Sequence, residues 1–293
     1  TLNDGTIGRV INDGYGNVET YIKNIQNITG SLNYNDTLKG NSENNIINGQ
    51  GGHDLIYGIA GENTLIGDTG NDTIYTATDE AGTARGDVVL GGQGIDTIVS
   101  SFNNDLIIGG EFVSNVYEDL EGDWIDYSSL VSANSYGVSV NLTATTALTF
   151  IGADSDRSTY NGNYSKVYKL DSLGAVTTDF DNLRGIDYIK GSAYSDTLKG
   201  DASGNSILAG AGDDTIFLDA SGADYIDGGT GSNWLSLEDN YRGTIDLRSA
   251  YNTAGSTGGA VTVYNIQNVL GRSASDRDET VWGRSDSSYG ETF

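Results

Sequence analysis

A nine-residue repeat limits the possible folds of this chain more than any other feature of its sequence. From Ser31, five consecutive blocks of nine residues follow in register, and further runs occupy residues 82–126, 182–217 and 219–236. Across these sixteen blocks, position six is Asp in eleven, Asn in four and Ser in one, while position eight is always Ile, Leu or Val. An oxygen-bearing side chain and an aliphatic side chain therefore recur at a fixed spacing. This periodicity predicts a repeat architecture.

The chemistry of each block predicts a turn followed by a short strand. The first six positions are rich in Gly, Asn and Asp, which suit a tight turn that requires positive φ. In the three-residue strand that follows, position eight points inward while positions seven and nine point outward, because side chains alternate between the faces. Two successive blocks then complete one coil, so each block lies above the block two positions earlier. The expected fold is all-β, with parallel β-roll segments.

The spacing also predicts metal sites. Each turn brings backbone carbonyl groups and one carboxylate to the gap between coils, and calcium takes six to eight oxygen ligands of these kinds. The alternative is that each Asp only caps its own turn by bonding local amides. The predicted calcium ligands are the eleven position-six aspartates: Asp36, Asp54, Asp72, Asp87, Asp96, Asp105, Asp123, Asp187, Asp196, Asp214 and Asp224.

The coil geometry predicts which of these residues stack. Asp36, Asp54 and Asp72 should line one side of the first roll and Asn45 and Asn63 the other, where an uncharged amide predicts weaker or empty sites. The other expected stacks are Asp87 with Asp105 and Asp123, Asp96 with Ser114, Asp196 with Asp214 and Asn233, and Asp187 with Asn205 and Asp224.

Composition narrows the class of protein. Lys plus Arg number 15 and Asp plus Glu 41, so the net charge is -26, which predicts an expanded chain in the absence of cations. This acidic balance gives no indication of nucleic-acid binding. The chain has no Cys, which excludes disulfides and thiolate metal sites, and no Pro, as expected for ladder-bonded strands. No apolar run approaches the roughly 18 residues of a transmembrane segment.

The repeats alternate with segments of another kind. We expect a lead-in over residues 1–30, a first roll over 31–126 with a break at 76–81, and a β-strand insertion over 127–181. A second roll should cover 182–236 and a short β insertion 237–265. Residues 266–293 should form a degenerate third roll or a cap, with Glu279 where Asp is expected. The sequence DTLKG opens both rolls, at Asp36 and Asp196. Because the N-terminal sequence NIQNITGS is similar to YNIQNVLGRS at Tyr264, near the end of the second insertion, the chain is expected to be part of a longer protein of the same alternation.

The nonapeptides, together with the sequences DWIDYS at Asp123 and GVSVNL at Gly137, resemble the repeats-in-toxin (RTX) proteins of Gram-negative bacteria. The resemblance implies several bound calcium ions, calcium-dependent folding outside the cell and export by a type I secretion exporter. It also implies membership in a large surface-layer protein, adhesin, toxin or secreted enzyme. The Asn and Ser residues at position six depart from the family pattern and put full calcium occupancy in doubt.

Two functions of different classes follow. The chain is predicted to be a structural module of a bacterial cell-surface protein, which calcium folds and stiffens and which self-associates in a lattice. The alternative is a C-terminal secretion and folding module of an exported enzyme or toxin. The long insertions favour the first, although their aromatic residues could also stack on sugars. No enzymatic activity is predicted, because His53, the only histidine, lies at position five of a turn where a solvent-facing residue is expected.

Overall fold

The computed structural model describes the chain as two compact units, and each is treated separately below. The first unit comprises residues 1–125 and 179–186, and the second comprises 126–178 and 187–293. Throughout the described ranges the regular structure is β-strand, with no α-helix. The described residues are 8–10, 20–22, 25–76, 86–101, 103–113, 116–118, 122–130, 137–143, 145–148, 162–170, 174–218, 222–238, 243–247, 252–256, 259–271 and 280–282.

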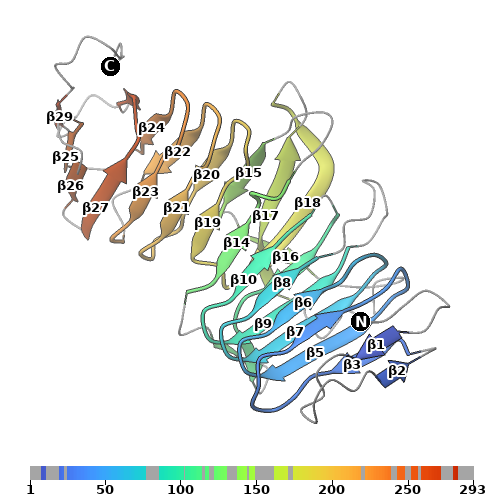
Figure 1. Cartoon of the computed structure of the whole chain (residues 1–293). Helices are drawn as coiled ribbons and strands as arrows, with labels where there is room; N and C mark the ends of the chain where they lie inside the picture. The colour runs from blue at the N-terminus through green and yellow to red at the C-terminus, as the bar shows by residue number, and fades with distance from the viewer. Residues whose placement is uncertain are drawn as a thin grey trace. The chain divides into compact units, whose positions relative to one another are not determined.

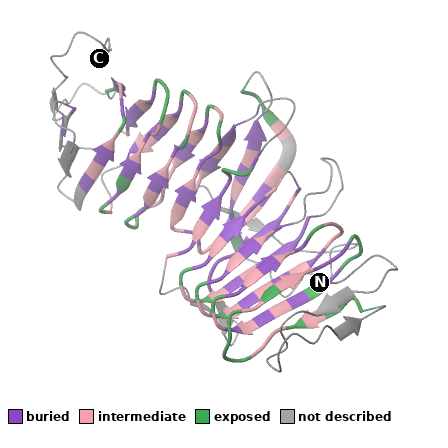
Figure 2. Ribbon diagram, viewed as in Figure 1, coloured by how far each residue is buried: buried purple, intermediate pink, exposed green. Residues whose placement is uncertain are grey.

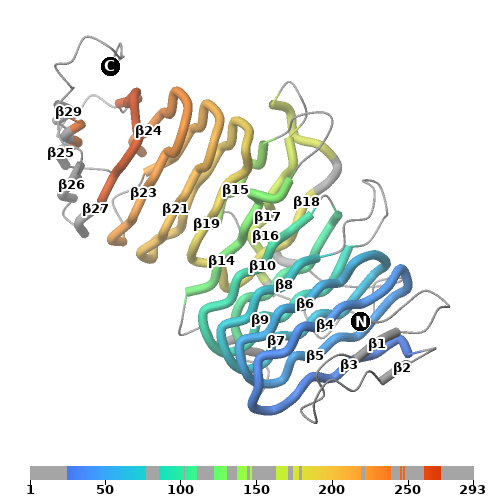
Figure 3. Tube along the Cα trace, in the orientation of Figure 1, coloured from blue at the N-terminus to red at the C-terminus, as the bar shows by residue number. Residues whose placement is uncertain are grey.

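The first unit is a roll of short parallel strands in two sheets (Figure 1). One sheet contains β4 (Thr37–Lys39), β6 (Leu55–Tyr57), β8 (Thr73–Tyr75), β10 (Thr97–Val99) and β14 (Trp124–Asp126). The other contains β3 (Asn27–Thr29), β5 (Ile46–Gly51), β7 (Thr64–Thr69), β9 (Val88–Gln93), β11 (Leu106–Ile108) and β18 (Val176–Arg184). The chain alternates between the sheets, as its tube trace shows (Figure 3). A separate antiparallel pair consists of β1 (Gly8–Val10) and β2 (Thr20–Ile22).

The register of the parallel strands matches the nine-residue spacing. Leu38 is paired with Ile56, and Ile56 with Ile74, so position eight of one block lies above position eight of the block two positions earlier. The break in the repeat at 76–81 does not interrupt this stacking, because β9 pairs with β7 and β10 pairs with β8. The two runs of repeats that the break separates in sequence therefore form one continuous roll.

Position eight forms the core of both units. After the first block, every position-eight side chain whose burial the structure describes is at most 2% exposed. The neighbouring positions seven and nine are mostly intermediate in burial, which produces the alternating colours along the strands in Figure 2. These core residues are Ile47, Ile56, Leu65, Ile74, Val89, Ile98, Ile107, Ile125, Ile189, Leu198, Ile207, Ile216, Ile226 and Leu235.

One of the sixteen blocks does not form a coil of the roll. Residues 109–117, which contain Ser114, match the repeat in sequence but include an antiparallel hairpin of β12 (Glu111–Val113) and β13 (Val116–Glu118). Ser114 itself lies outside the described residues. The hairpin is inserted into a turn, so it moves Asp123, the one later position-six residue of the run, to the opposite side from the one predicted.

The second unit is a roll of the same kind. Its two sheets contain β19 (Tyr188–Lys190), β21 (Ser206–Leu208), β23 (Tyr225–Asp227) and β27 (Gly259–Tyr264) on one side, and β15 (Val138–Asn141), β20 (Thr197–Lys199), β22 (Thr215–Leu218), β24 (Trp234–Leu237) and β28 (Asn268–Leu270) on the other. All sequential neighbours within each group are parallel. The predicted all-β fold, with parallel β-roll segments and small β insertions, is confirmed.

The insertions contribute strands to the roll of the second unit. β15, from the first insertion, pairs in parallel with β20, and β27, from the second, pairs in parallel with β23. Further strands of these insertions pair antiparallel with their neighbours: β16 (Thr145–Leu148) with β17 (Gly162–Leu170), β17 with β15, and β26 (Asn252–Ser256) with β25 (Gly243–Asp246) and β27. The C-terminal β29 (Thr280–Trp282) pairs in parallel with β25, while Glu279 lies outside the described residues.

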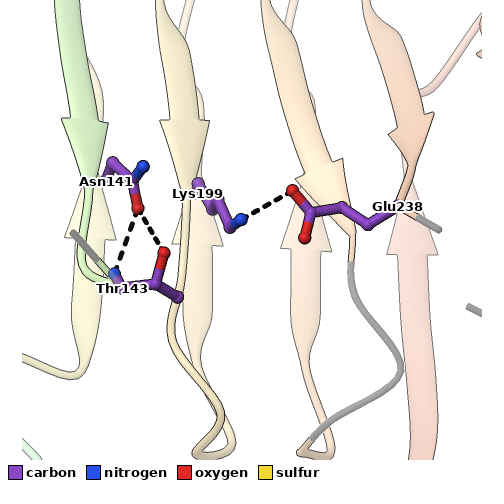
Figure 4. Close-up of polar contacts among 4 residues, drawn as sticks. All are labelled: Asn141, Thr143, Lys199 and Glu238. Atoms are coloured by element: carbon purple, nitrogen blue, oxygen red, sulfur yellow. Dashed lines mark hydrogen bonds and ion pairs between the residues drawn. The ribbon is translucent and has the colours of Figure 1, made fainter. Parts of the chain in front are cut away.

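Polar side chains make contacts at the strand ends of the second unit. Lys199 Nζ lies 2.6 Å from Glu238 Oε1, which links the end of β20 to the end of β24 across the intervening β22 (Figure 4). At the end of β15, Asn141 Oδ1 accepts hydrogen bonds from the Thr143 backbone N–H and hydroxyl at 3.1 and 2.7 Å. The ion pair is only partly buried, so it contributes about 0 to 1 kcal/mol.

Candidate metal centre

The position-six side chains form hydrogen-bonded ladders that run from coil to coil. In most coils the backbone N–H of the position-six residue donates to the Oδ1 atom of the position-six residue in the next coil. The Asp36 N–H thus donates to Asp54 at 2.7 Å, and the Asp54 N–H donates to Asp72 at 2.7 Å. Asn serves equally well as an acceptor, since the Asn45 N–H donates to Asn63 Oδ1 at 2.9 Å. One polar atom of these side chains is therefore committed to the stacking of coils, whether the residue is Asp or Asn.

The first unit contains two such ladders. Column A consists of Asp36, Asp54, Asp72, Asp96 and Asp123. Column B consists of Asn45, Asn63, Asp87, Asp105 and Asp181. The predicted separation of the first three aspartates from the two asparagines is confirmed. The predicted stacking of Asp123 on Asp105, and of Ser114 on Asp96, is wrong, because the hairpin in the preceding turn moves Asp123 into column A.

The second unit has two ladders as well. Column C begins at the Val138 N–H, which donates to Asp196 at 2.7 Å, and continues through Asp214, Asn233 and Gln267. Column D contains Asp187, Asn205 and Asp224, whose strands β19, β21 and β23 pair in register; the Asn205 N–H donates to Asp224 Oδ1 at 3.0 Å. The stacks predicted for this part of the chain are confirmed.

The second oxygen of each Asp faces the turn of its own block. A Cβ placed on Gly49 would overlap Asp54 Oδ2 and lie 3.0 Å from the Gly67 carbonyl oxygen, so these two oxygens converge on one point. The turn before Asp72 repeats this arrangement: a Cβ on Gly67 would overlap both Asp72 Oδ2 and the Gly91 carbonyl oxygen. One carboxylate oxygen and one carbonyl oxygen from the next coil thus meet at a glycine. This is the mixed oxygen environment that calcium tolerates.

Some of these inner oxygens are fully buried and find no hydrogen-bond partner among the described residues. Examples are those of Asp54, Asp72 and Asp214, whose residues are 2%, 1% and 0% exposed. Buried carboxylate oxygens are normally paired with a donor or a cation, because desolvating an unpaired charge is costly. Within the described ranges, no group of three or more Asp, Glu, His or Cys side chains comes together, so most ligands of a cation at these points would be neutral oxygens such as backbone carbonyls. The oxygens present fit a bound calcium ion.

The same burial shifts the pKa values of these carboxyl groups. Burial raises the pKa of Asp72 and of Asp214 to about 6 and that of Asp196 to about 7, and it also raises the pKa of Asp54. The charge of the preceding aspartate in the ladder adds to this effect, while the backbone N–H of that same residue, which donates a hydrogen bond to the carboxylate, opposes it. Without a cation, the buried carboxyl groups of Asp54, Asp72, Asp196 and Asp214 therefore hold their protons to a higher pH than an exposed aspartate does.

In another group of turns, the protein itself supplies a donor to the inner oxygen. Asp36 Oδ2 accepts the Ser31 N–H at 2.6 Å and the Ser31 hydroxyl at 2.8 Å. Asp196 Oδ2 accepts the Ser192 N–H at 2.7 Å, while the Ser192 hydroxyl donates to Asp196 Oδ1 at 2.8 Å. We call these closed turns, and we call the turns in which no such backbone donor reaches the inner atom open turns.

The backbone at position two distinguishes the two classes. In open turns this residue has positive φ: Gln50 (74°) precedes Asp54, Asp68 (80°) precedes Asp72 and Gly210 (104°) precedes Asp214. The N–H of Gln50 consequently points away and donates to Asn48 Oδ1 at 2.8 Å. Non-glycine residues rarely adopt such backbone angles.

Sequence analysis missed Asp181, which closes column B from within the first insertion. Its carboxylate is fully buried; Oδ1 accepts the Asp105 N–H at 3.1 Å and Oδ2 accepts the Ser100 hydroxyl at 2.7 Å. The available signal was the sequence Asp-Asn-Leu-Arg, in which Leu183 occupies position eight and is paired with Ile107. His53 lies where it was predicted, in an exposed turn, and its Nδ1 accepts the Asn71 N–H at 2.8 Å.

Comparison with known proteins identifies the repeat. A family model described as the RTX calcium-binding nonapeptide repeat matches residues 32–61, 57–78, 81–112, 183–216 and 219–239. The chain contains RTX calcium-binding nonapeptide repeats. RTX repeats bind calcium ions, so the oxygens that converge at the turns have an identified ligand. Such repeats indicate an extracellular calcium-binding module of a secreted protein, as was expected from the sequence.

Comparisons with whole proteins add little to this result. No curated protein sequence matches the chain. Twelve chains of solved structures match, among them the crystal structure of the extracellular lipase LipA from Serratia marcescens, with 15% sequence identity and a TM-score of 0.21. The match covers 71% of this chain and 38% of the lipase chain. In the described part of the chain, no helix is long and apolar enough to cross a membrane.

Proposed function

We propose that the chain is a calcium-dependent structural module of a bacterial cell-surface protein, either a surface layer or an adhesin. The observation that carries this proposal is the way the insertions join the roll. β15 and β27 lie in the same ladders as the repeat strands, and their side chains Val140 and Val263 are 1% and 0% exposed. The insertions therefore share the core of the second unit, which favours a load-bearing module over a plain array of repeats.

Calcium would act in this module by linking coils. At Asp54 and Asp72 the buried inner oxygen lies beside a carbonyl group of the next coil, and the inner oxygen of Asp214 is equally buried. A divalent ion at these oxygens would neutralise a charge that otherwise opposes folding. Because these turns form only when coils stack, calcium binding contributes directly to the free energy of folding.

The test is circular dichroism and thermal melting of the chain with calcium and with a chelator. We expect most of the strand signal, or a large part of the melting temperature, to be lost in chelator and restored by calcium but not by an equal concentration of magnesium. Equal strand content and equal melting temperature in the two conditions would refute calcium-dependent folding.

We further propose that the chain is exported unfolded by a type I exporter and folds outside the cell. This route requires weak sites, with dissociation constants on the order of 10⁻⁴ to 10⁻³ M, as in extracellular modules. A calcium titration followed by tyrosine and tryptophan fluorescence gives the constant. A nanomolar value would mean that the chain folds before export and would contradict this route.

The alternative is a secretion and folding module of an exported enzyme or toxin, and self-association separates the two functions. A surface-layer module should assemble into sheets on calcium addition, which electron microscopy and light scattering detect; a chain that stays monomeric at saturating calcium supports the alternative.

We propose no enzymatic activity for the chain itself. The acidic pair Asp213 and Asp214 serves the ladders: Asp213 Oδ1 accepts the Ser232 N–H at 2.8 Å, and Asp214 Oδ2 faces its own turn.

A further inference from the structure

Two asparagines occupy open turns, and their side-chain amides lie where a cation would be expected. The turn before Asn63 has positive φ at Ile59 (74°), and the turn before Asn233 has positive φ at Gly229 (69°). Both therefore share the backbone of the turns before Asp54, Asp72 and Asp214. Both side chains are also buried, at 2% and 0% exposure.

In these two turns the amide nitrogen lies beside backbone carbonyl oxygens. Asn63 Nδ2 lies 3.0 Å from the Ala60 carbonyl oxygen, 3.3 Å from that of Gly61 and 3.1 Å from Asp87 Oδ1 in the next coil. Asn233 Nδ2 lies 2.6 Å from the Gly228 carbonyl oxygen and 3.1 Å from that of Asn265. The Oδ1 atoms accept the ladder N–H, as they do in the aspartates. The amide thus directs two N–H groups at oxygens that would otherwise be available to a cation.

The other two asparagines are in closed turns and have a different set of bonds. Asn45 Oδ1 accepts the Asn41 N–H at 2.8 Å, and Asn205 Oδ1 accepts the Asp201 N–H at 2.8 Å. Their amide nitrogens donate to the carbonyl oxygen at position six of the coil before, at Gln26 and Asp187, with 2.9 Å in both cases. Here a backbone N–H already occupies the inner oxygen, as it does at Asp196.

We propose that the side-chain amides of Asn63 and Asn233 replace calcium, so that these two open turns are closed without metal. The proposal rests on the proposed function, in which the matching aspartate turns bind calcium. Backbone conformation at position two then determines whether a turn can accept an ion, and the residue at position six determines whether the closing group is an ion or an amide. A change of Asn to Asp should create a calcium site only in the open turns.

Four isosteric variants test this. Asn63→Asp and Asn233→Asp change open turns in different units, while Asn45→Asp and Asn205→Asp are the matched controls in closed turns. Calcium bound per chain is measured at saturating calcium by equilibrium dialysis and elemental analysis. We expect each open-turn variant to bind one more ion than the wild type, and the closed-turn variants to bind the same number as the wild type.

The reverse change, from Asp to Asn in an open turn, provides a second test. Asp54→Asn and Asp214→Asn should each lose one bound ion yet melt at a higher temperature than the wild type in chelator, because the new amide supplies donors to the turn. Equal gains in open and closed turns, or no gain at Asn63 and Asn233 in variants that fold, would overturn the proposal. If one open-turn variant fails to fold, the other decides. A wild type that binds no calcium would instead refute the proposed function, so the two failures are distinguishable.

Discussion

The turns before Asp72 in column A and Asn63 in column B have nearly the same backbone and opposite side-chain chemistry. Position two has φ of 80° at Asp68 and 74° at Ile59, and both position-six side chains accept a ladder bond from the coil before. One inner atom is a carboxylate oxygen without a partner, and the other is an amide nitrogen bonded to turn carbonyls. The comparison teaches that the ladder and the metal site are separable, because the ladder uses Oδ1 and the site uses the other atom.

Core substitutions on the strands that follow the two columns should lower the free energy of unfolding by similar amounts. These are the largest effects that we predict for single substitutions. Ile56 on β6 and Leu65 on β7 are both fully buried at position eight. Replacement of either by Ala should lower the free energy of unfolding by about 2 to 5 kcal/mol, through lost burial and a cavity. Denaturant unfolding in calcium measures the loss. If Leu65→Ala were harmless while Ile56→Ala was costly, the two sides would not share one core.

The columns should respond differently to changes at position six. Asp54→Asn keeps the acceptor for the Asp36 N–H but removes the charge, so it should abolish the calcium contribution of that turn. At calcium concentrations of about 100 times the dissociation constant, this contribution is roughly 2.7 kcal/mol per site. The measurement is the difference in unfolding free energy between calcium and chelator.

Asn63→Ala is the counterpart in column B. It leaves the buried Asn45 N–H without its acceptor, which costs about 1 to 3 kcal/mol with or without calcium. The calcium midpoint should therefore stay at the wild-type value. A midpoint that moved with Asn63→Ala and stayed fixed with Asp54→Asn would reverse the roles that we give to the two columns.

The pH dependence of folding stability provides a further test of the comparison between aspartate and asparagine turns, with a smaller expected effect. In the metal-free fold the pKa values of Asp72 and Asp214 are raised to about 6 and that of Asp196 to about 7, compared with 3.8 in the unfolded chain. The protonated forms are thus favoured in the fold. Their contribution to stability is fully present below about pH 4 and is lost as the pH rises through 6 to 7.

The chelated protein should accordingly melt at a higher temperature at pH 5 than at pH 7.5. In calcium the trend should be opposite, since protons compete for the same oxygens and calcium affinity should fall as the pH is lowered. Melting curves at both pH values, with calcium and with chelator, provide the test. Asp72→Asn should reduce the pH dependence in chelator, and an unchanged dependence in that variant would show that other groups cause it.

Much of the roll could be predicted from the sequence because the nine-residue repeat places an aliphatic core residue at the same position of each block. An aliphatic residue two positions after each Asp or Asn fixes which side chains point inward, and therefore which residues stack. The prediction failed at Ser114, where Val116 satisfies the spacing although the surrounding residues form a hairpin. It also missed Asp181, because the residues before it lack the glycines that mark the other turns.

The class of each turn could not be predicted, since it depends on backbone conformation at position two. Gly210 and Gly229 would be expected to allow positive φ, but Gln50, Ile59 and Asp68 adopt it without being glycine. Asp201 and Asp68 are the same residue type at the same position, yet the first lies in a closed turn and the second in an open one. The residue type at position two therefore does not determine the class of the turn.

The most direct test is a crystal structure of the chain grown in calcium, with ions located by anomalous scattering. The account predicts ions at the inner oxygens of Asp54, Asp72 and Asp214, in contact with turn carbonyl groups, and none within coordination distance of the Asn63 or Asn233 side chains. Ions of equal occupancy beside Asn63 and Asp72 would contradict it. In that case backbone carbonyl groups would determine calcium binding, and the residue at position six would matter only for the stacking of coils.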